Sequence, residues 1–231
     1  MQTLSQYISE WVNNHKEQSS KLRIFNPEFI QSFDPLQKQR FVLTFYHLRG
    51  SFYRFLWYIG SISPSKAYKD VILKNISEEF GHTLSHEDWY LEFANDFGVD
   101  IKSEILKPKH NFDWVQGFND SHLEYILKQD FELAWSAFGA YEKLDNADYD
   151  NLYNLAVNLG SSKKGLVFFD IHRNVEHYES IDPLLQIIWD KNPAIVQKGF
   201  EFIGDHQLKM WANLGEYLAK DYNCFTKLSK K

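Results

Sequence analysis

The chain has 231 residues, a formal net charge of −6 and an aromatic share of 17%. Acidic and basic residues are mixed along it without a basic block, which argues against nucleic acid as a partner. The single cysteine, Cys224, excludes a disulfide framework and cysteine-rich zinc sites. The polar residues 1–20 do not resemble a signal peptide, and the longest apolar run, around 52–59, is too short to cross a membrane. We therefore expect a soluble, cytoplasmic protein.

Nearly every segment has the period of an amphipathic helix, and no segment alternates convincingly like a strand. Cap residues mark the first helix starts. They predict a helix from Thr3–Gln6 to about His15, a short one from Asn26-Pro27 to about Phe33, and a long aromatic helix from Asp34-Pro35 to Ile59, ended by Gly60.

The same signals continue through the rest of the chain, apart from residues 99–112, which we expect to be a polar connection. The predicted helices are Ser63-Pro64 to Gly81, Ser85 to Gly98, 121–142, 146–158, 168–179, a short one from Asp182-Pro183, and a last one from Asn192-Pro193 to about Leu218. We predict a single all-α domain over residues 1–231, with N-terminal helices in 1–33 and a frayed tail at 222–231.

The predicted helix 168–179 carries an imidazole and two carboxylates. On a continuous helix His172, Glu176 and Glu179 share a face, because residues four and seven apart are neighbours. Phe168 and Phe169 extend roughly the same face, so the polar groups point inward. Charged side chains are rarely buried unless they are paired or bound to a cation. The pattern indicates a metal site or a proton network, although a solvated face with pairing along the helix is the ordinary alternative.

Two other helices offer inward acids. Glu79 and His86 are seven residues apart and share a face if the helix is continuous; if Gly81 breaks it, they end one helix and begin the next. His82 is a competing ligand. Glu142 continues an apolar stripe and should be buried, although it could simply be the edge of that stripe. Three helices that present carboxylates and imidazoles to one interior are typical of dinuclear metal sites, and this ligand mixture suits iron or manganese better than structural zinc.

The ordered set of motifs resembles a known family. It consists of Glu79-x6-His86 followed by Asp88-Trp89-Tyr90 and Phe93, then Glu142 after Ala140-Tyr141, then His172-x3-Glu176 after Phe168-Phe169. Over roughly residues 40–215 the set resembles the haem-oxygenase-like diiron oxidases and oxygenases, in particular their CADD-like branch, with TenA and PqqC as relatives in fold. The resemblance implies a haem-oxygenase-like bundle of about seven to eight helices. It also implies two irons, or iron and manganese, with O2 as co-substrate and no haem.

Carried over by position, the resemblance implies that Glu79, His86, Glu142, His172 and Glu176 bind metal. The family usually has a histidine at the sixth position, where this chain has Glu179. A glutamate can still ligate, and His177 could replace it only if the helix contained a π-bulge. The sixth ligand is therefore the point at which the chain departs from the family pattern.

The resemblance implies an oxidoreductase that acts on a small carboxylate-bearing substrate such as an amino acid, a fatty acid or an aromatic amine precursor. The aromatic helix over 41–58 is mainly core, but Arg49 or Arg54, with Tyr46, could bind the substrate carboxylate, since a guanidinium pairs with it bidentately. One alternative is a metal-poor, non-catalytic interaction protein on the same fold. Another is a TenA-like hydrolase, which the lack of a mid-chain cysteine disfavours. We also allow for a homodimer and an external electron donor.

Overall fold

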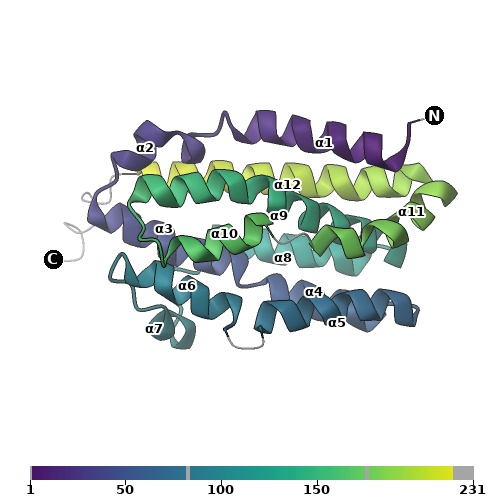
Figure 1. Ribbon diagram of the computed structural model, residues 1–231, viewed down its shortest axis with the longest axis horizontal. Coiled ribbons are helices and arrows are strands. Elements are labelled where there is room, and N and C mark those ends of the chain that lie inside the picture. The colour runs from purple at the N-terminus through teal and green to yellow at the C-terminus, as the bar shows by residue number, and fades with distance from the viewer. Residues whose placement is uncertain (1, 82–83, 175–176, 221–231) are drawn as a thin grey trace.

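The computed structural model describes residues 2–81, 84–174 and 177–220, and every regular element within them is helical. The predicted all-α class is therefore confirmed. The elements are α1 (Leu4–Ser19), the 3₁₀ helix η1 (Arg23–Phe25), α2 (Pro27–Gln31), α3 (Pro35–Arg49), α4 (Phe52–Ile62), α5 (Lys66–Phe80), α6 (His86–Asn95), α7 (Ile101–Leu106), α8 (Asp113–Lys128), α9 (Phe131–Leu159), α10 (Leu166–Asn174), the 3₁₀ helix η2 (His177–Ser180), α11 (Asp182–Lys191) and α12 (Pro193–Ala219). In Figure 1 the molecule is elongated, and α1 and α12 run along its length.

Local capping chemistry explains why several helices begin where the sequence predicts. The Thr3 side chain accepts from the backbone of Gln6 while Gln6 reaches back, which completes the predicted capping box of α1. Ser85 and Asp88 form the same reciprocal pair at the start of α6. Asn26 caps α2 through its side-chain oxygen. These starts are confirmed because a cap depends only on residues within one turn.

The aromatic helix predicted to end at Ile59 is wrong in its extent. It is divided into α3 and α4 at Gly50 and Ser51, and α4 continues past Gly60 to Ile62. The predicted start of the next helix at Ser63-Pro64 is also wrong, because α5 begins at Lys66. Gly60 is tolerated within α4, where its missing side chain leaves room for Ile72 of α5.

The middle of the chain departs further from the predicted pattern. The helix expected over 121–142 belongs to two helices, α8 and α9, which are separated at Gln129 and Asp130. The helices expected to end at Glu142 and to begin at Asn146 are one continuous α9. The connection predicted over 99–112 contains α7, whose first turn is capped by the Asp100 side chain on Ser103. These divisions account for more helices than the seven to eight expected.

The predicted helix over 168–179 is not a single α-helix in the described residues. α10 ends at Asn174, and residues 177–180 form the 3₁₀ helix η2. A 3₁₀ helix has three residues per turn instead of 3.6, so side chains beyond α10 no longer follow its faces. The expectation that Glu179 shares the face of His172 is therefore wrong, and Glu179 is exposed.

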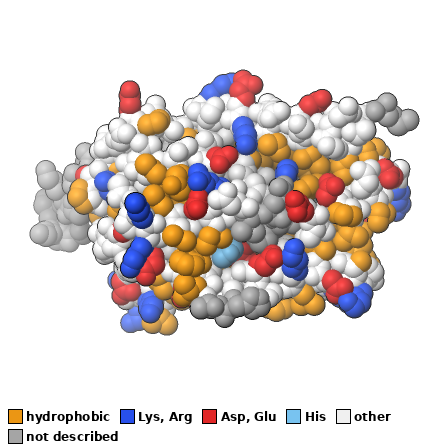
Figure 2. All heavy atoms as spheres, in the orientation of Figure 1, with side chains coloured by type: hydrophobic (Ala, Val, Ile, Leu, Met, Phe, Trp, Pro, Cys, Tyr) orange, Lys and Arg blue, Asp and Glu red, His pale blue; other side chains and the backbone are white. Residues whose placement is uncertain are grey.

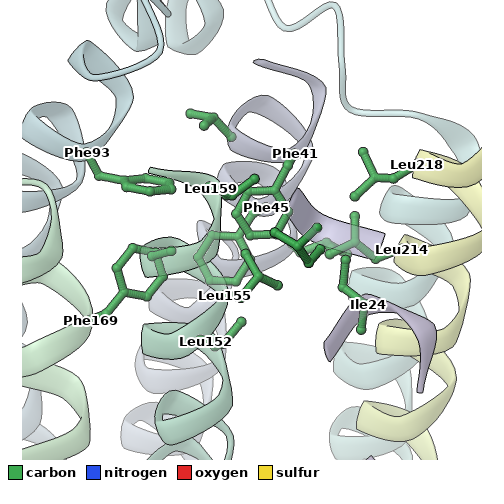
Figure 3. Packing of buried hydrophobic residues seen from close by; sticks show 14 of the residues in the cluster. Ile24, Phe41, Phe45, Phe93, Leu152, Leu155, Leu159, Phe169, Leu214 and Leu218 are labelled. Atoms are coloured by element: carbon green, nitrogen blue, oxygen red, sulfur yellow. The ribbon is translucent and has the colours of Figure 1, made fainter. Parts of the chain in front are cut away.

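The two longest helices, α9 and α12, pack against each other and contribute to both hydrophobic clusters of the core. A Cβ atom at Gly199 of α12 would lie 2.7 Å from the backbone nitrogen of Ala137 in α9, so this contact requires glycine. Figure 3 shows how one cluster joins α3, α6, α9, α10 and α12 through aromatic and leucine side chains, among them Phe41, Phe45, Phe93, Phe169, Leu155 and Leu214. This packing holds α6 and α10 beside α9, which positions the site described next.

Candidate metal centre

Three side chains from three helices meet beside α9. Glu79 lies in the last turn of α5, His86 is the first residue of α6, and His172 lies near the end of α10. One potential ligand atom from each residue lies within 4.8 Å of those from the other two. Gly81, with φ of 64°, ends α5 and turns the chain towards α6. Glu79 and His86 are therefore brought together across a helix break at Gly81. This break was one of the two alternatives that the sequence left open.

Each of the two imidazoles has a ring nitrogen that could bind a metal ion. His172 Nδ1 is 2.6 Å from the carbonyl oxygen of Phe168, so Nδ1 carries the proton and Nε2 keeps a lone pair. His86 Nδ1 lies 3.0 Å from Glu79 Oε2. That approach lacks hydrogen-bond geometry, and no described residue satisfies this buried nitrogen. The two imidazole rings are 4.4 Å apart between centroids. An imidazole fixed by a backbone carbonyl is the usual arrangement of a metal-ligating histidine.

The electrostatics of the cluster favour the neutral imidazole. Desolvation and the neighbouring His86 lower the pKa of His172 to about 3, against a weaker opposing effect of Glu79. A neutral imidazole is the form that binds a metal ion. The buried ring nitrogen of His86 without a partner, the fixed tautomer of His172 and the adjacent carboxylate therefore fit a divalent cation with mixed nitrogen and oxygen ligands, as iron prefers.

Glu142 lies close to this group but is not one of its three members. It is on α9, its side chain is 2% exposed, and its Oε1 accepts a hydrogen bond from Asn75 Nδ2 at 3.3 Å. Desolvation raises the pKa of Glu142 well above its usual range, and the carboxylates of Asp145 and Glu79 add to the rise. The predicted burial of Glu142 is confirmed. Its role as a ligand stays a prediction.

Of the remaining predicted ligands, the structure describes the side chain of Glu179 alone. Glu176 and the competing His82 lie outside the described residues. Glu179 is exposed on η2 and does not join the three-residue group. The side chain of His177 is likewise outside the described part. The structure thus brings together Glu79, His86 and His172, with Glu142 nearby.

A cavity of about 220 Å³ opens onto the cluster. Its wall includes Tyr46 and Arg49, two of the residues predicted to bind substrate, together with Glu79, His86 and His172. The third, Arg54, is not among the lining residues, and its exposed guanidinium lies 3.4 Å from Asp120. In Figure 2 imidazole atoms reach the surface near the middle of the visible face, beside hydrophobic and acidic side chains.

Two lining residues were not found by sequence reasoning. Asp145 pairs with Arg49 at 2.5 Å, and the ring of Tyr149 stacks on His172 with centroids 4.4 Å apart. Both residues follow Glu142 on α9, at one and two turns. The signal was the unbroken helical spacing from Glu142 through Asp145 to Tyr149, which a division of this helix at Asn146 concealed.

An all-helical bundle in which two imidazoles and a carboxylate meet is typical of helical metal-binding proteins. Residues 39–178, more than half of the chain, match the family described as an iron-containing redox enzyme. The chain therefore belongs to this family of iron-containing oxidoreductases, and the matched region contains the whole candidate cluster. This confirms the resemblance noted from the sequence motifs. No curated protein is similar enough to the chain to count as a match. Within the described ranges, no helix is both long and apolar enough to cross a membrane.

Proposed function

We propose that this protein is a non-haem, O2-dependent iron oxidase or oxygenase that acts on a small molecule bound in the cavity beside Glu79, His86 and His172. The observation that carries the proposal is the meeting of these three side chains within 4.8 Å. Glu142 and Glu176 would contribute to a second position for iron or manganese. Bound iron would supply the redox chemistry that couples oxidation of the substrate to reduction of O2.

The residues of the chain would act by binding, orienting and excluding water. The carbonyl of Phe168 holds the proton of His172 at Nδ1, which leaves Nε2 for the metal. Tyr149 packs flat against the same imidazole and fixes its plane. Tyr46 and Tyr90 lie at 5.7 Å between ring centroids and line the cavity, so the substrate is surrounded by apolar ring faces. The small volume of the cavity, about 220 Å³, limits the access of bulk water to the reacting atoms.

A carboxylate on the substrate would meet Arg49, the arginine in the cavity wall. Its guanidinium is held by Asp145 at 2.5 Å and lies over the ring of Tyr141 at 4.9 Å. A substrate carboxylate would therefore share or replace the contact with Asp145. This arrangement preorganises the guanidinium and makes its recognition of the substrate competitive.

The test is an oxygen-triggered absorbance measurement on protein loaded anaerobically with ferrous iron. The proposal expects an optical change when O2 is added to the wild type and none in His172→Ala. The matched control is His110→Ala, because His110 bonds to Glu104 away from this cavity. Iron content below about half an ion per chain, with no optical change on adding O2, would contradict the proposal.

A metal-poor interaction protein on the same fold is the second candidate. The observation that favours it is the exposure of Glu179 on η2, away from the three-residue cluster. A chain that binds one iron tightly and shows no reaction with O2 would support this candidate. Loading with two metal ions per chain would exclude it.

A further inference from the structure

The positive charge in the wall of the cavity is already neutralised. Arg49 pairs with Asp145 at 2.5 Å, and the two side chains are only 13% and 18% exposed. The guanidinium also lies over the rings of Tyr141 and Tyr149. Glu79 is accounted for by the candidate metal centre. Among the described residues that line the cavity, Glu87 is the remaining charged side chain without an ion-pair partner.

Glu87 lies at the mouth of the cavity, directly after His86. Its side chain is exposed, it lines the same cavity, and it forms no ion pair with any described residue. Tyr46 is its neighbour in the cavity wall: desolvation, and after it the nearby carboxylate of Glu87, raise the pKa of Tyr46 to about 12. A neutral hydroxyl beside the carboxylate does not cancel its charge.

Aromatic rings line the same cavity as this carboxylate. Tyr46, Phe52 and Tyr53 line the cavity beside Glu87. A cation is attracted to the face of an aromatic ring, and the attraction is strongest where water is partly excluded. A carboxylate among tyrosine and phenylalanine rings therefore has the chemistry of a receptor for an ammonium group.

We propose that Glu87, Tyr46 and Tyr53 form a subsite for a primary ammonium group, so that the small substrate of the candidate metal centre carries an amine. That the bound amine is a substrate rests on the proposed function, whereas the binding of the amine does not depend on it. Because Glu87 follows His86, a bound ammonium would hold the neighbouring carbon atoms close to the metal cluster. The volume of about 220 Å³ lies below the roughly 300–1,000 Å³ of pockets for drug-sized ligands, which restricts the substrate to a small molecule.

The ordinary role of Glu87 would be to stabilise the N-terminus of α6, where acids in the first turn interact favourably with the helix dipole. Asp88 already caps this terminus through the backbone and side chain of Ser85. The helix dipole explains an acid at this position but not its place in the cavity wall beside Tyr46. The two roles predict different results when ligand binding is measured.

The experiment compares three probes of similar shape and different charge: 2-phenylethylamine, 2-phenylethanol and 3-phenylpropanoate. Binding is measured by calorimetry without oxygen, on both metal-free and ferrous-loaded protein. We expect the amine to bind about tenfold more tightly than the alcohol, the effect of one charge-assisted hydrogen bond. Glu87→Gln should remove this preference, whereas Glu92→Gln, which changes an exposed acid of α6 outside this cavity, should keep it.

Equal affinity for amine and alcohol in the wild type would overturn the ammonium subsite, as would a preference that survives in Glu87→Gln. Circular dichroism of both variants separates loss of binding from loss of fold. Failure to bind iron with a retained preference for the amine would contradict the proposed function and leave the ammonium subsite standing. Normal iron loading without a preference for the amine would contradict the ammonium subsite and leave the proposed function standing.

Discussion

Glu142 is a buried carboxylate whose charge is costly without a cation. Its neighbours Glu79 and Asp145 are also acids, and it accepts a hydrogen bond from Asn75 at 3.3 Å. A buried charge without compensation is unfavourable by several kcal/mol, and a bound cation removes that cost. The metal-free protein therefore carries electrostatic strain at this residue that a metal ion would relieve.

We predict that Glu142→Gln leaves the metal-free fold unchanged or more stable, by on the order of 1–3 kcal/mol, because an amide removes the charge and can still accept from Asn75. The same change should reduce metal binding. Thermal melts of metal-free protein, taken together with metal content, measure both effects. A large loss of metal-free stability with unchanged metal content would show that Glu142 is a structural core residue instead of a ligand.

At the residue scale the sequence predicts best what depends on neighbours in the chain. The cluster partners Glu79 and His86 could be predicted because seven residues separate them, and either reading of Gly81 keeps them close. The pairing of Arg49 with Asp145 joins residues far apart in the chain, and no local sequence pattern predicts it. Long-range partners follow from how helices pack, so spacing along one helix does not reveal them.

At the scale of elements, the close contact between α9 and α12 depends on a glycine. A Cβ at Gly199 would lie within 2.8 Å of backbone and side-chain atoms of Ser136 in α9. We predict that Gly199→Ala destabilises the protein by about 1–3 kcal/mol through overpacking, measured by urea denaturation. Gly117→Ala is the matched control, because the space around this exposed position in α8 is open. It should be neutral or stabilising by up to about 1 kcal/mol. Equal effects of the two changes would contradict the close packing.

The short helix α7 is tethered by one carboxylate. Glu104 accepts from His47 of α3 at 2.8 Å and from the backbone nitrogens of Lys109 and His110, both at 2.7 Å. Burial acts to raise the pKa of Glu104, but these bonds and the His110 side chain outweigh it and lower the pKa to about 2.

A carboxylate whose pKa is depressed on folding contributes stability that is present above its unfolded pKa and is lost as the pH falls through its folded pKa. We therefore predict that Glu104→Gln costs stability between pH 5 and 7, and that the difference from wild type narrows as the pH falls from about 4.5 to about 2. Urea midpoints across this range give the measurement. A difference that stays constant or widens on acidification would contradict the tether.

The element boundaries show where sequence patterns stop being informative. Capping residues mark the starts of α1, α2 and α6 because the chemistry is confined to one turn. The break between α8 and α9 has no proline or glycine to signal it, since it is set by packing. The end of α10 is likewise not marked by a proline or glycine, and it explains why Glu179 does not lie on the face of His172. Tertiary contacts override local propensity at both places.

At the scale of the whole molecule, the candidate metal centre joins three helices that are otherwise held mainly by the hydrophobic core. The three ligands Glu79, His86 and His172 come from α5, α6 and α10, respectively. Of these helices, α10 packs against both α6 and α9. A ligand that binds only the folded state stabilises it by about 2.7 kcal/mol at a concentration of 100 Kd. Metal binding should therefore act on the stability of the whole fold.

We predict that ferrous iron under anaerobic conditions raises the Tm by several degrees and that a chelator reverses the shift. Hydrogen exchange should slow most at the end of α5, the start of α6 and the end of α10, where the ligands lie. The matched control is His172→Ala, which should lose the shift. An identical shift in wild type and His172→Ala would place the stabilising metal elsewhere.

The measurement that tests the central claim most directly is the stoichiometry of ferrous iron bound by purified wild type, Glu79→Gln, His86→Ala, His172→Ala and the control His110→Ala. The three cluster residues share one site, whereas His110 bonds to Glu104 outside the cavity. We predict that wild type and His110→Ala bind iron equally. Each variant of Glu79, His86 or His172 should lose iron while retaining its helical circular dichroism. Equal iron content in all five proteins would contradict the assignment of Glu79, His86 and His172 as the metal centre.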